Sequence, residues 1–438
     1  MVNDNVEGLE QGNATAISPS LLELFHTFLR IGLLSFGGPA AQIALMHRMI
    51  VDEHKWLNEK QYLNALNFCM LLPGPEAMQL ATYAGWRIRG VTGGLLAGLL
   101  FVIPGALVIL AMALIYVKFG NVPLLDAVFL GIKAAVIMIV IEALLRVSKR
   151  SLSTRTEWLI AAAAFVGIFF FNIPYPLIIL GAAAVGFLAL TQIDASGKQS
   201  PPPLPGKPML VLLGTLFLLW ALPIVIFNAV SGFSFLAHVA EFFSILALVT
   251  FGGAYAVLAY MAQDVVGNLG WLTTGEMMDG LGLAETTPGP LILVTEFVAF
   301  VAGFREQGIG MAIAAASVTL WVTFLPCFIW IFAGAPYIDW LGAQARLRGA
   351  LSAITAAVVG VILNLSLWFA LHVLFKTPTT TSFGPIQFQN PALSSLDWRV
   401  VALSVLCGLA LFKFHWSVAK VILLAAIGGI GTLLLGVH

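Results

Sequence analysis

Charged residues are scarce in this chain. Only 10% of its 438 residues are Asp, Glu, Lys or Arg, and 21 basic residues balance 21 acidic ones, so that the formal net charge is zero. A soluble globular protein carries about 25% charged residues. With so few charged residues, a chain of this length cannot cover a water-exposed surface with polar groups. A net charge of zero also gives no sign of the basic surface that binds nucleic acid. These absences argue against a soluble enzyme, a nucleic-acid partner and a disordered scaffold.

Metal-binding and redox patterns are also missing. The three cysteines, Cys69, Cys327 and Cys407, lie far apart inside apolar runs. No Cys/His spacing suggests a zinc site, an iron–sulfur cluster or a disulfide framework. The seven histidines include no pair at helical spacing inside an apolar run, which argues against haem. The sequence therefore predicts neither a metal nor a cofactor.

Apolar residues dominate instead, at 60% of the chain with a mean hydropathy of +0.98. Because one membrane crossing takes about 20 apolar residues, the chain is predicted to be an all-α polytopic membrane protein. Residues 1–20 are expected to form a disordered tail and the Pro-rich run 191–207 a linker. The apolar segments lie near 21–46, 62–85, 94–117, 124–146, 157–171, 174–190, 208–229, 236–261, 277–301, 310–334, 348–375, 398–414 and 418–436.

The distribution of basic residues predicts the orientation. If every segment crosses, more Lys and Arg residues fall on the side that carries the N-terminus. Cytoplasmic loops are enriched in these residues, so we expect a cytoplasmic N-terminus in a multi-pass protein of the inner (plasma) membrane.

The chain contains an internal repeat. The motif at 35–38 (SFGG) returns at 250–253 (TFGG), and the motif at 73–75 (PGP) returns at 288–290, with the same separation in both cases. Further on the separation is slightly larger, from Pro104 to Pro326 and from 132–136 to 354–358. These matches predict two homologous repeats of about six segments each, 21–190 and 236–438, joined by a connecting transmembrane helix at 208–229.

Counting segments suggests how the repeats are related. Seven segments separate the two repeat starts, and an odd number of crossings gives opposite orientations. Inverted repeats are common in secondary transporters, with the substrate site between them. A re-entrant PGP segment would instead make the repeats parallel, so that arrangement stays open.

The repeated motifs break helices at membrane depth. Proline on either side of a glycine cannot continue a helix, and irregular backbone in a membrane must be buried in protein or line a cavity. New half-helices starting there would offer free N–H groups to an oxyanion. Close helix packing is the alternative role for the glycines. The predicted substrate-binding set combines the broken backbone with nearby hydroxyl and amide side chains: Ser35, Gly37, Gly38, Pro73, Gly74, Pro75, Gln79, Thr250, Gly252, Gly253, Thr286, Thr287, Pro288, Gly289 and Pro290.

A few charges lie inside the apolar runs. Arg30 is the candidate counter-charge for an anion, although it can also snorkel to the interface or pair with Glu23. Glu76, directly after Pro75, is predicted to gate or to couple protons to the substrate, with a purely structural helix-dipole role as the alternative. Glu285 and Glu296 are weaker candidates of the same kind. For Lys133, which precedes Glu142 in the run 124–146, a structural or interfacial role weighs at least as much.

The motifs together resemble the chromate ion transporter (CHR) family, in its long two-domain form. The resemblance rests on FLRIGLLSFGGPAAQIALM (28–46), LLPGPEAMQLATYAGW (71–86), GGLLAGLLFVIPG (93–105), TFGG (250–253) and ETTPGP (285–290). It implies a secondary active transporter that exports chromate across the inner membrane, driven by the proton gradient, and so confers chromate resistance. It implies no enzymatic activity.

Several alternatives stay open at this point. Sulfate shares the shape and charge of chromate, so transport of sulfate or another oxyanion is a rival substrate assignment. A membrane-embedded enzyme, such as a chromate reductase or a lipid-modifying enzyme, is a rival class, but no electron-carrier motif supports it. Membrane lipid is the expected surrounding, and a second copy of the chain is a candidate partner.

Overall fold

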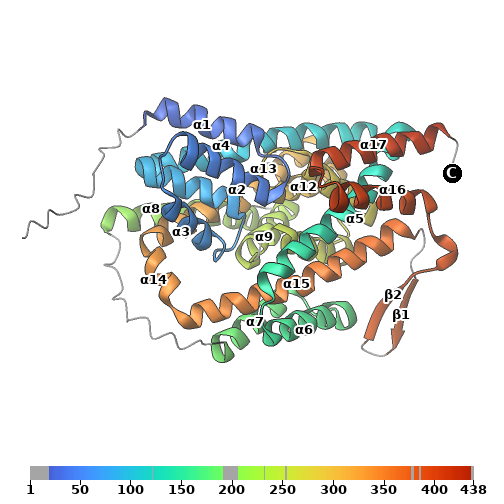
Figure 1. Cartoon of the computed structure of the whole chain (residues 1–438). Helices are drawn as coiled ribbons and strands as arrows, with labels where there is room; N and C mark the ends of the chain where they lie inside the picture. Colours follow the sequence, from blue (N-terminus) through green and yellow to red (C-terminus); the bar gives the residue numbers. More distant parts are fainter. Residues whose placement is uncertain are drawn as a thin grey trace, which may run out of the picture.

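In the computed structural model, the described residues are 19–120, 122–190, 206–230, 232–251, 254–375, 379–383 and 386–435. Most of the expected tail and linker, 1–18 and 191–205, lies outside them. The chain folds almost entirely into helices (Figure 1). The first half contains α1 (Leu21–Leu34), α2 (Gly38–His47), a π-helix (Arg48–Glu53), α3 (Glu59–Cys69), α4 (Glu76–Phe119), α5 (Pro123–Ser151), α6 (Arg155–Phe171) and α7 (Tyr175–Ala189).

The second half follows a connecting helix, α8 (Lys207–Ala229). A short β-hairpin follows the long helix α15 and is a local addition to an otherwise helical fold. The elements are α9 (Ser234–Val249), α10 (Ala254–Met261), a π-helix (Ala262–Asn268), α11 (Thr274–Thr286), 3-10 turns (Leu291–Leu293 and Ala335–Tyr337), α12 (Val294–Gln307), α13 (Ile309–Gly334), α14 (Ile338–Ala343), α15 (Ala345–Leu374), β1 (Thr379–Phe383), β2 (Ile386–Asn390), a 3-10 turn (Leu393–Ser395), α16 (Trp398–Gly408), a π-helix (Leu409–Lys413) and α17 (Val418–Leu434).

Membrane-spanning length is reached by five helices within the described residues. By length and composition these are Glu76–Phe119, Pro123–Ser151, Lys207–Ala229, Ile309–Tyr337 and Ala345–Leu374. The helix Glu76–Phe119 is itself broken at Arg89 and Gly90, where the backbone is not helical, and the other apolar segments are shorter or broken. Few residues of α8 are fully buried over its apolar length, as expected for a helix with one side facing lipid.

The helices break where the sequence predicts. Gly37 caps the start of α2 with φ +87°, a conformation that glycine adopts without strain, and a proline follows in the first turn. Pro75 is the N-cap of α4, whose first helical residue is Glu76. The expectation of new half-helices at FGG and PGP in the first repeat is therefore confirmed.

The two repeats share local detail as well as motifs. A capping box, in which two residues satisfy each other's backbone N–H groups, starts α3 with Asn58 and Gln61. The same device starts α11 with Thr273 and Glu276, at the equivalent positions of the second repeat. Such matched local structure supports the duplication predicted from sequence.

The repeats exchange their final helices. α5 of the first repeat packs on α16 and α17 of the second, whereas α15 of the second packs on α6 and α7 of the first. Small residues allow the backbones to touch: a Cβ atom on Gly131 would lie 1.9 Å from the carbonyl oxygen of Ala425, and one on Gly186 would lie 2.3 Å from that of Gly349. Because each repeat covers the long helix of the other, neither forms a separate domain.

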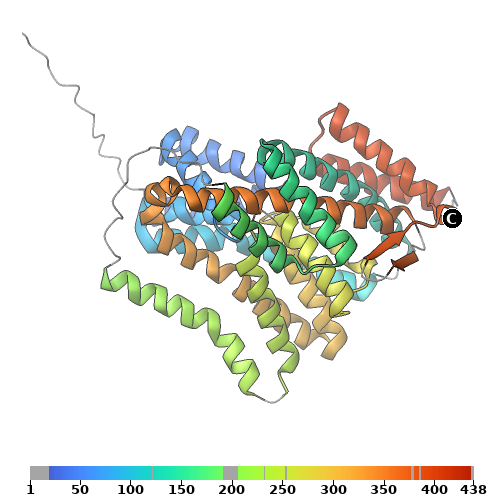
Figure 2. The same ribbon diagram turned by 90° about the horizontal axis from the view of Figure 1, so that it is seen from below.

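The equivalent helices α5 and α15 run in opposite directions. Glu157, just beyond the end of α5, accepts a 2.7 Å hydrogen bond from Ser352, near the start of α15. α5 and α15 also pack on each other, so the contact between the end of one and the start of the other makes them antiparallel. The start of α1 and the end of α17 lie at opposite ends of the molecule in both views (Figures 1 and 2). Since both helices are long enough to cross a membrane, the repeats are inverted.

Candidate functional site

The repeated motifs meet in two reciprocal pairs. The Gly74 N–H donates to the carbonyl oxygen of Thr250 at 2.8 Å, and the Gly289 N–H donates to that of Ser35 at 3.0 Å. Each PGP turn is thus bonded to the residue that precedes the FGG motif of the other repeat. Both glycines have positive φ, +113° at Gly74 and +88° at Gly289, which explains why glycine stands there.

Each PGP turn also packs on the long helix of the opposite repeat. A Cβ atom on Gly74 would lie 3.0 Å from Cys327 Sγ in α13. On the other side, a Cβ atom on Gly105 in α4 would lie 2.2 Å from the carbonyl oxygen of Pro288. Gly105 and Cys327 are equivalent positions, because each directly follows one of the two matched prolines, Pro104 in α4 and Pro326 in α13. The same interlock is therefore built twice.

Two buried amide side chains hold these turns. Gln79 donates to the carbonyl oxygen of Pro73 at 2.7 Å, within its own repeat. Gln42 crosses between repeats and donates to the carbonyl oxygen of Gly289 at 2.6 Å. Gln42 is absent from the site predicted by sequence, because nothing in its local pattern indicates a partner in the other repeat.

The predicted hydroxyl donors are used to close helix ends. The hydroxyl of each residue donates to a carbonyl oxygen about one turn earlier in the same helix. The donors are Ser35 to Ile31 at 2.6 Å, Thr250 to Leu246, Thr286 to Leu283 at 2.7 Å and Thr287 to Ala284 at 3.1 Å.

Other predicted residues lie apart from the helix breaks. Arg30 is exposed on α1, and Glu296 is buried in α12. Neither lines the two cavities described below. Gly252 and Gly253 lie outside the described residues.

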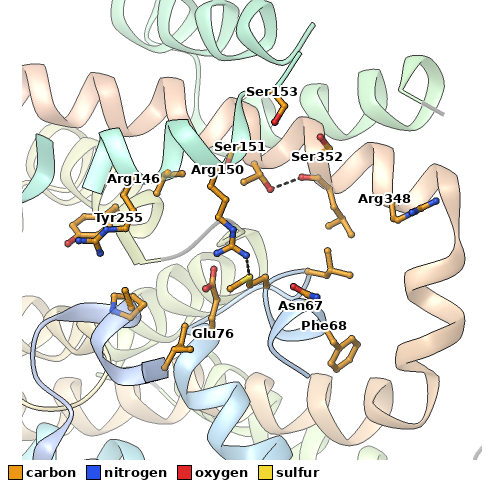
Figure 3. Close-up of a pocket in the computed structure, with 18 of the residues that line it drawn as sticks. Asn67, Phe68, Glu76, Arg146, Arg150, Ser151, Ser153, Tyr255, Arg348 and Ser352 are labelled. Atoms are coloured by element: carbon orange, nitrogen blue, oxygen red, sulfur yellow. Dashed lines mark hydrogen bonds between the residues drawn. The ribbon is translucent and has the colours of Figure 1, made fainter. Parts of the chain in front are cut away.

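A cavity of about 700 Å³ opens between the repeats (Figure 3). Its lining comes from α2, α3, the start of α4, the end of α5 and the start of α6 in the first repeat, and from α10, α14 and α15 in the second. The polar and charged lining residues are Asn64, Asn67, Glu76, Arg146, Arg150, Ser151, Ser153, Glu157, Tyr255, Arg348, Ser352 and Thr355.

Arginines supply the positive charge of this cavity. Arg146 and Arg150 come from successive turns at the end of α5, so both point the same way (Figure 3). Arg146 is paired with Glu142, one turn earlier. Arg150 donates to the sulfur of Met70, a weak acceptor, and no carboxylate in the described part of the chain lies within ion-pairing distance of it. Its guanidinium therefore keeps strong donors for an incoming oxyanion.

Glu76 faces Arg150 across the cavity (Figure 3). Because Glu76 is the first residue of α4, the positive end of that helix dipole lies at the cavity wall. One carboxylate, one guanidinium and one helix N-terminus thus meet in the same space. Of the residues predicted from sequence as site members, Glu76 is the one that lines this cavity.

Glu285 lies one contact behind the cavity. It is buried and accepts a 2.9 Å hydrogen bond from Tyr255, which lines the cavity. Glu157 is held more rigidly, since it caps α6 and also accepts the bond from Ser352. Glu157 is therefore a wall residue rather than a free carboxylate.

The second cavity, of about 350 Å³, is lined by apolar and amide side chains such as Asn172, Gln263 and Asn268, and no charged residue lines it. The larger cavity, which is lined by arginines, therefore suits an oxyanion better.

The sequence signal for the arginines is their spacing. From hydropathy alone, Arg146 and Arg150 fall at the edge of an apolar run and count as loop charges that set orientation. One helical turn separates them, which places them on one face of a helix, and α5 extends to Ser151. The local signal existed, but only the fold shows that this face borders a cavity.

A family model described as "Chromate transporter" matches residues 22–187 and 237–431. The chain is 32% identical over 372 residues to a chromate transport protein of Pseudomonas aeruginosa, covering 82% of this chain and 83% of the relative. It is 29% identical over 386 residues to a chromate transport protein of Cupriavidus metallidurans, covering 83% and 86%. No solved structure matches the chain.

Proposed function

Because the chain belongs to the chromate transporter family, we propose that it carries chromate across the membrane through the cavity between its repeats. Its apolar helices and its family make it a multi-pass membrane protein. The observation that supports the proposed site best is Arg150, a guanidinium without a carboxylate partner among the described residues, facing the N-terminus of α4. The relatives from Pseudomonas aeruginosa and Cupriavidus metallidurans are named for chromate transport, which makes chromate the first substrate to test.

The charge balance of the cavity suits a dianion. Its lining carries three arginines and two glutamates, a formal net charge of +1. Protonation of Glu76 raises this balance to +2, which matches the charge of chromate. Binding is then favourable, because opposite charges in a medium of low effective dielectric attract strongly.

Proton coupling follows from the same geometry. An ionised Glu76 faces Arg150 and the α4 N-terminus and repels an incoming anion from both. A protonated Glu76 releases both groups to the substrate. We therefore propose that one proton moves with each chromate dianion, so that one net negative charge crosses the membrane per turnover. The membrane potential, negative inside the cell, then drives export, which makes transport a secondary active process.

Direction and location complete the proposal. We propose export across the inner membrane, with a cytoplasmic N-terminus, because basic residues favour that side. Export of chromate by this route gives the cell chromate resistance. Sulfate, or another tetrahedral oxyanion, stays a rival substrate, since the cavity can recognise the charge and the hydrogen-bonding oxygens of an anion but not its central atom.

The test is chromate flux in everted and right-side-out membrane vesicles. The parent is expected to take up labelled chromate into everted vesicles when a membrane potential makes their interior positive. Arg150→Gln is expected to abolish most of this uptake. Arg155→Gln is the matched control, because Arg155 lies nearby at the start of α6 and outside the cavity lining. Normal uptake by Arg150→Gln rejects the site, and preferential uptake of sulfate by the parent rejects chromate as the substrate.

A further inference from the structure

The inverted repeats place a counterpart of the cavity at the other end of the molecule. Lys133 precedes Arg146 by about 20 Å along α5, at a rise of about 1.5 Å per residue. At this level Lys133 Nζ lies 2.9 Å from Asp279 Oδ1. Tyr116, near the end of α4, donates to Asp279 Oδ2 at 2.9 Å. Three elements, α4, α5 and α11, are tied together here.

The repeat relation maps this triad onto the open cavity. By the separation that relates the two PGP motifs, Asp279 corresponds to Asn64. By the larger separation that relates α4 to α13 and α5 to α15, Lys133 corresponds to Thr355 and Tyr116 to Ile338. Asn64, Thr355 and Ile338 all line the 700 Å³ cavity. The space that is open at one end is therefore filled at the other by a bonded triad.

Apolar side chains complete the closure. Three buried residues stand at positions whose counterparts also line the open cavity. They are Leu283, Phe129 and Phe369, which correspond to Phe68, Leu351 and Val147. Tyr116 packs edge-on against Phe129 and Phe297, with ring centroids 5.4 Å and 5.1 Å apart.

We propose that Lys133, Asp279 and Tyr116 form the closed gate of the transport path, opposite the open cavity. The structure then represents one end-state of alternating access. In the other end-state the Lys133–Asp279 pair separates, and the space around Leu283 opens. Lys133 then offers its ammonium group to the departing oxyanion. Because a gate serves only a transporter, this assignment rests on the proposed function.

The asymmetry of the sequence supports a gate rather than a general structural pair. The first-repeat position of Asp279 is an uncharged asparagine, and the second-repeat position of Lys133 is an uncharged threonine. The ion pair is therefore built at one end of the path and not at the other. Such a difference biases which end stays closed in the absence of substrate.

Thiol labelling without chromate tests the gate separately from transport. The reporter is Leu283→Cys, read against the parent, whose three cysteines are buried. A membrane-impermeant maleimide is expected to label it slowly. Adding Asp279→Asn is expected to raise the rate about tenfold or more, as a minor open state becomes readily populated. Asn67→Cys, in the open cavity, is expected to label from the opposite side of the membrane.

Two variants guard against misreading. The double variant Lys133→Thr with Asp279→Asn introduces the residues of the other repeat and leaves no unpaired buried charge. Labelling of Leu283→Cys in this double variant therefore tests the gate if the protein with Asp279→Asn alone does not accumulate. Asp397→Asn is the matched control, since Asp397 and Arg399 form an ion pair with side-chain exposures of 8% and 22%, against 9% and 21% for Asp279 and Lys133. Unchanged labelling of Leu283→Cys in the double variant, or labelling from the same side as Asn67→Cys, overturns the gate. The labelling rate does not depend on whether the parent transports chromate, so failure of the proposed substrate would leave this test of the gate intact.

Discussion

Gly74→Ala is expected to destabilise the interlock between the repeats by roughly 2–5 kcal/mol. Gly74 has φ +113°, and a left-handed backbone conformation costs about 1–2 kcal/mol for a residue with a Cβ atom. That Cβ atom would lie 3.0 Å from Cys327 Sγ and 3.0 Å from Gln79 Nε2. Overpacking of a well-filled core adds about 1–3 kcal/mol.

Gly232→Ala separates the two contributions. Gly232 also has positive φ, +96°, but nothing lies within 4 Å of its Cβ position. It should therefore lose about 1–2 kcal/mol from the backbone alone. The excess loss in Gly74→Ala is the crowding against the opposite repeat.

Unfolding in mixed micelles with increasing SDS, followed by circular dichroism, measures both variants. A double-mutant cycle with Cys327→Ala then identifies the crowding partner, because contacting residues couple by about 0.5–3 kcal/mol. If Gly74→Ala loses no more stability than Gly232→Ala, or if Cys327→Ala recovers none of the loss, the interlock does not have the tight packing described above.

Three further predictions concern charge. Arg150→Gln should raise the half-saturating chromate concentration about tenfold to a hundredfold, since a charge-assisted hydrogen bond is worth about 1.5–3 kcal/mol; vesicle uptake at graded chromate concentrations measures it. Glu76→Gln should keep chromate binding but make uptake insensitive to the proton gradient, which dissipating the gradient in the same vesicles checks. His47, beyond the apolar segment 21–46, contacts Glu59 at 2.6 Å, and this hydrogen bond raises the pKa of His47 above 6.5. The pair therefore stabilises the protein at low pH and loses this effect as pH rises through the raised pKa, so the melting temperature should fall less between about pH 6 and about pH 9 in Glu59→Gln than in the parent.

The sequence was sufficient to predict the repeats and the helix breaks. Proline and glycine act locally, so Pro75 at the start of α4 and Gly37 at the start of α2 follow from their own neighbourhoods. The duplication was visible because the SFGG/TFGG and PGP motifs share one separation. Counting the apolar segments between the repeat starts favoured their inversion and left a parallel arrangement open.

The pairing between the motifs was out of reach. The hydrogen bonds from Gly74 to Thr250 and from Gly289 to Ser35 join residues that no local rule connects. The exchange of the final helices between repeats has the same origin, because apolar helices of similar length offer no sequence signal for their partner. Convergence of all four motifs at one site was expected, whereas the structure joins them in two pairs, and none of the four bonded residues lines either cavity.

Candidate site residues were only partly predictable. Glu76 was recognised because it follows a helix break in a chain with few charges. Arg150 was not, since hydropathy places it at the edge of a span, where a basic residue normally faces water. Arg30 attracted attention for its position in an apolar run, yet its side chain is exposed on α1.

Equilibrium binding of labelled chromate to the purified protein tests the central proposal most directly. The parent should bind chromate saturably at one site, and Arg150→Gln should weaken this binding about tenfold or more while Arg30→Gln leaves it unchanged. Unlabelled sulfate as competitor reports how far the site distinguishes the two anions. Parental affinity in Arg150→Gln together with lost binding in Arg30→Gln would contradict the cavity assignment and place the anion at α1 instead.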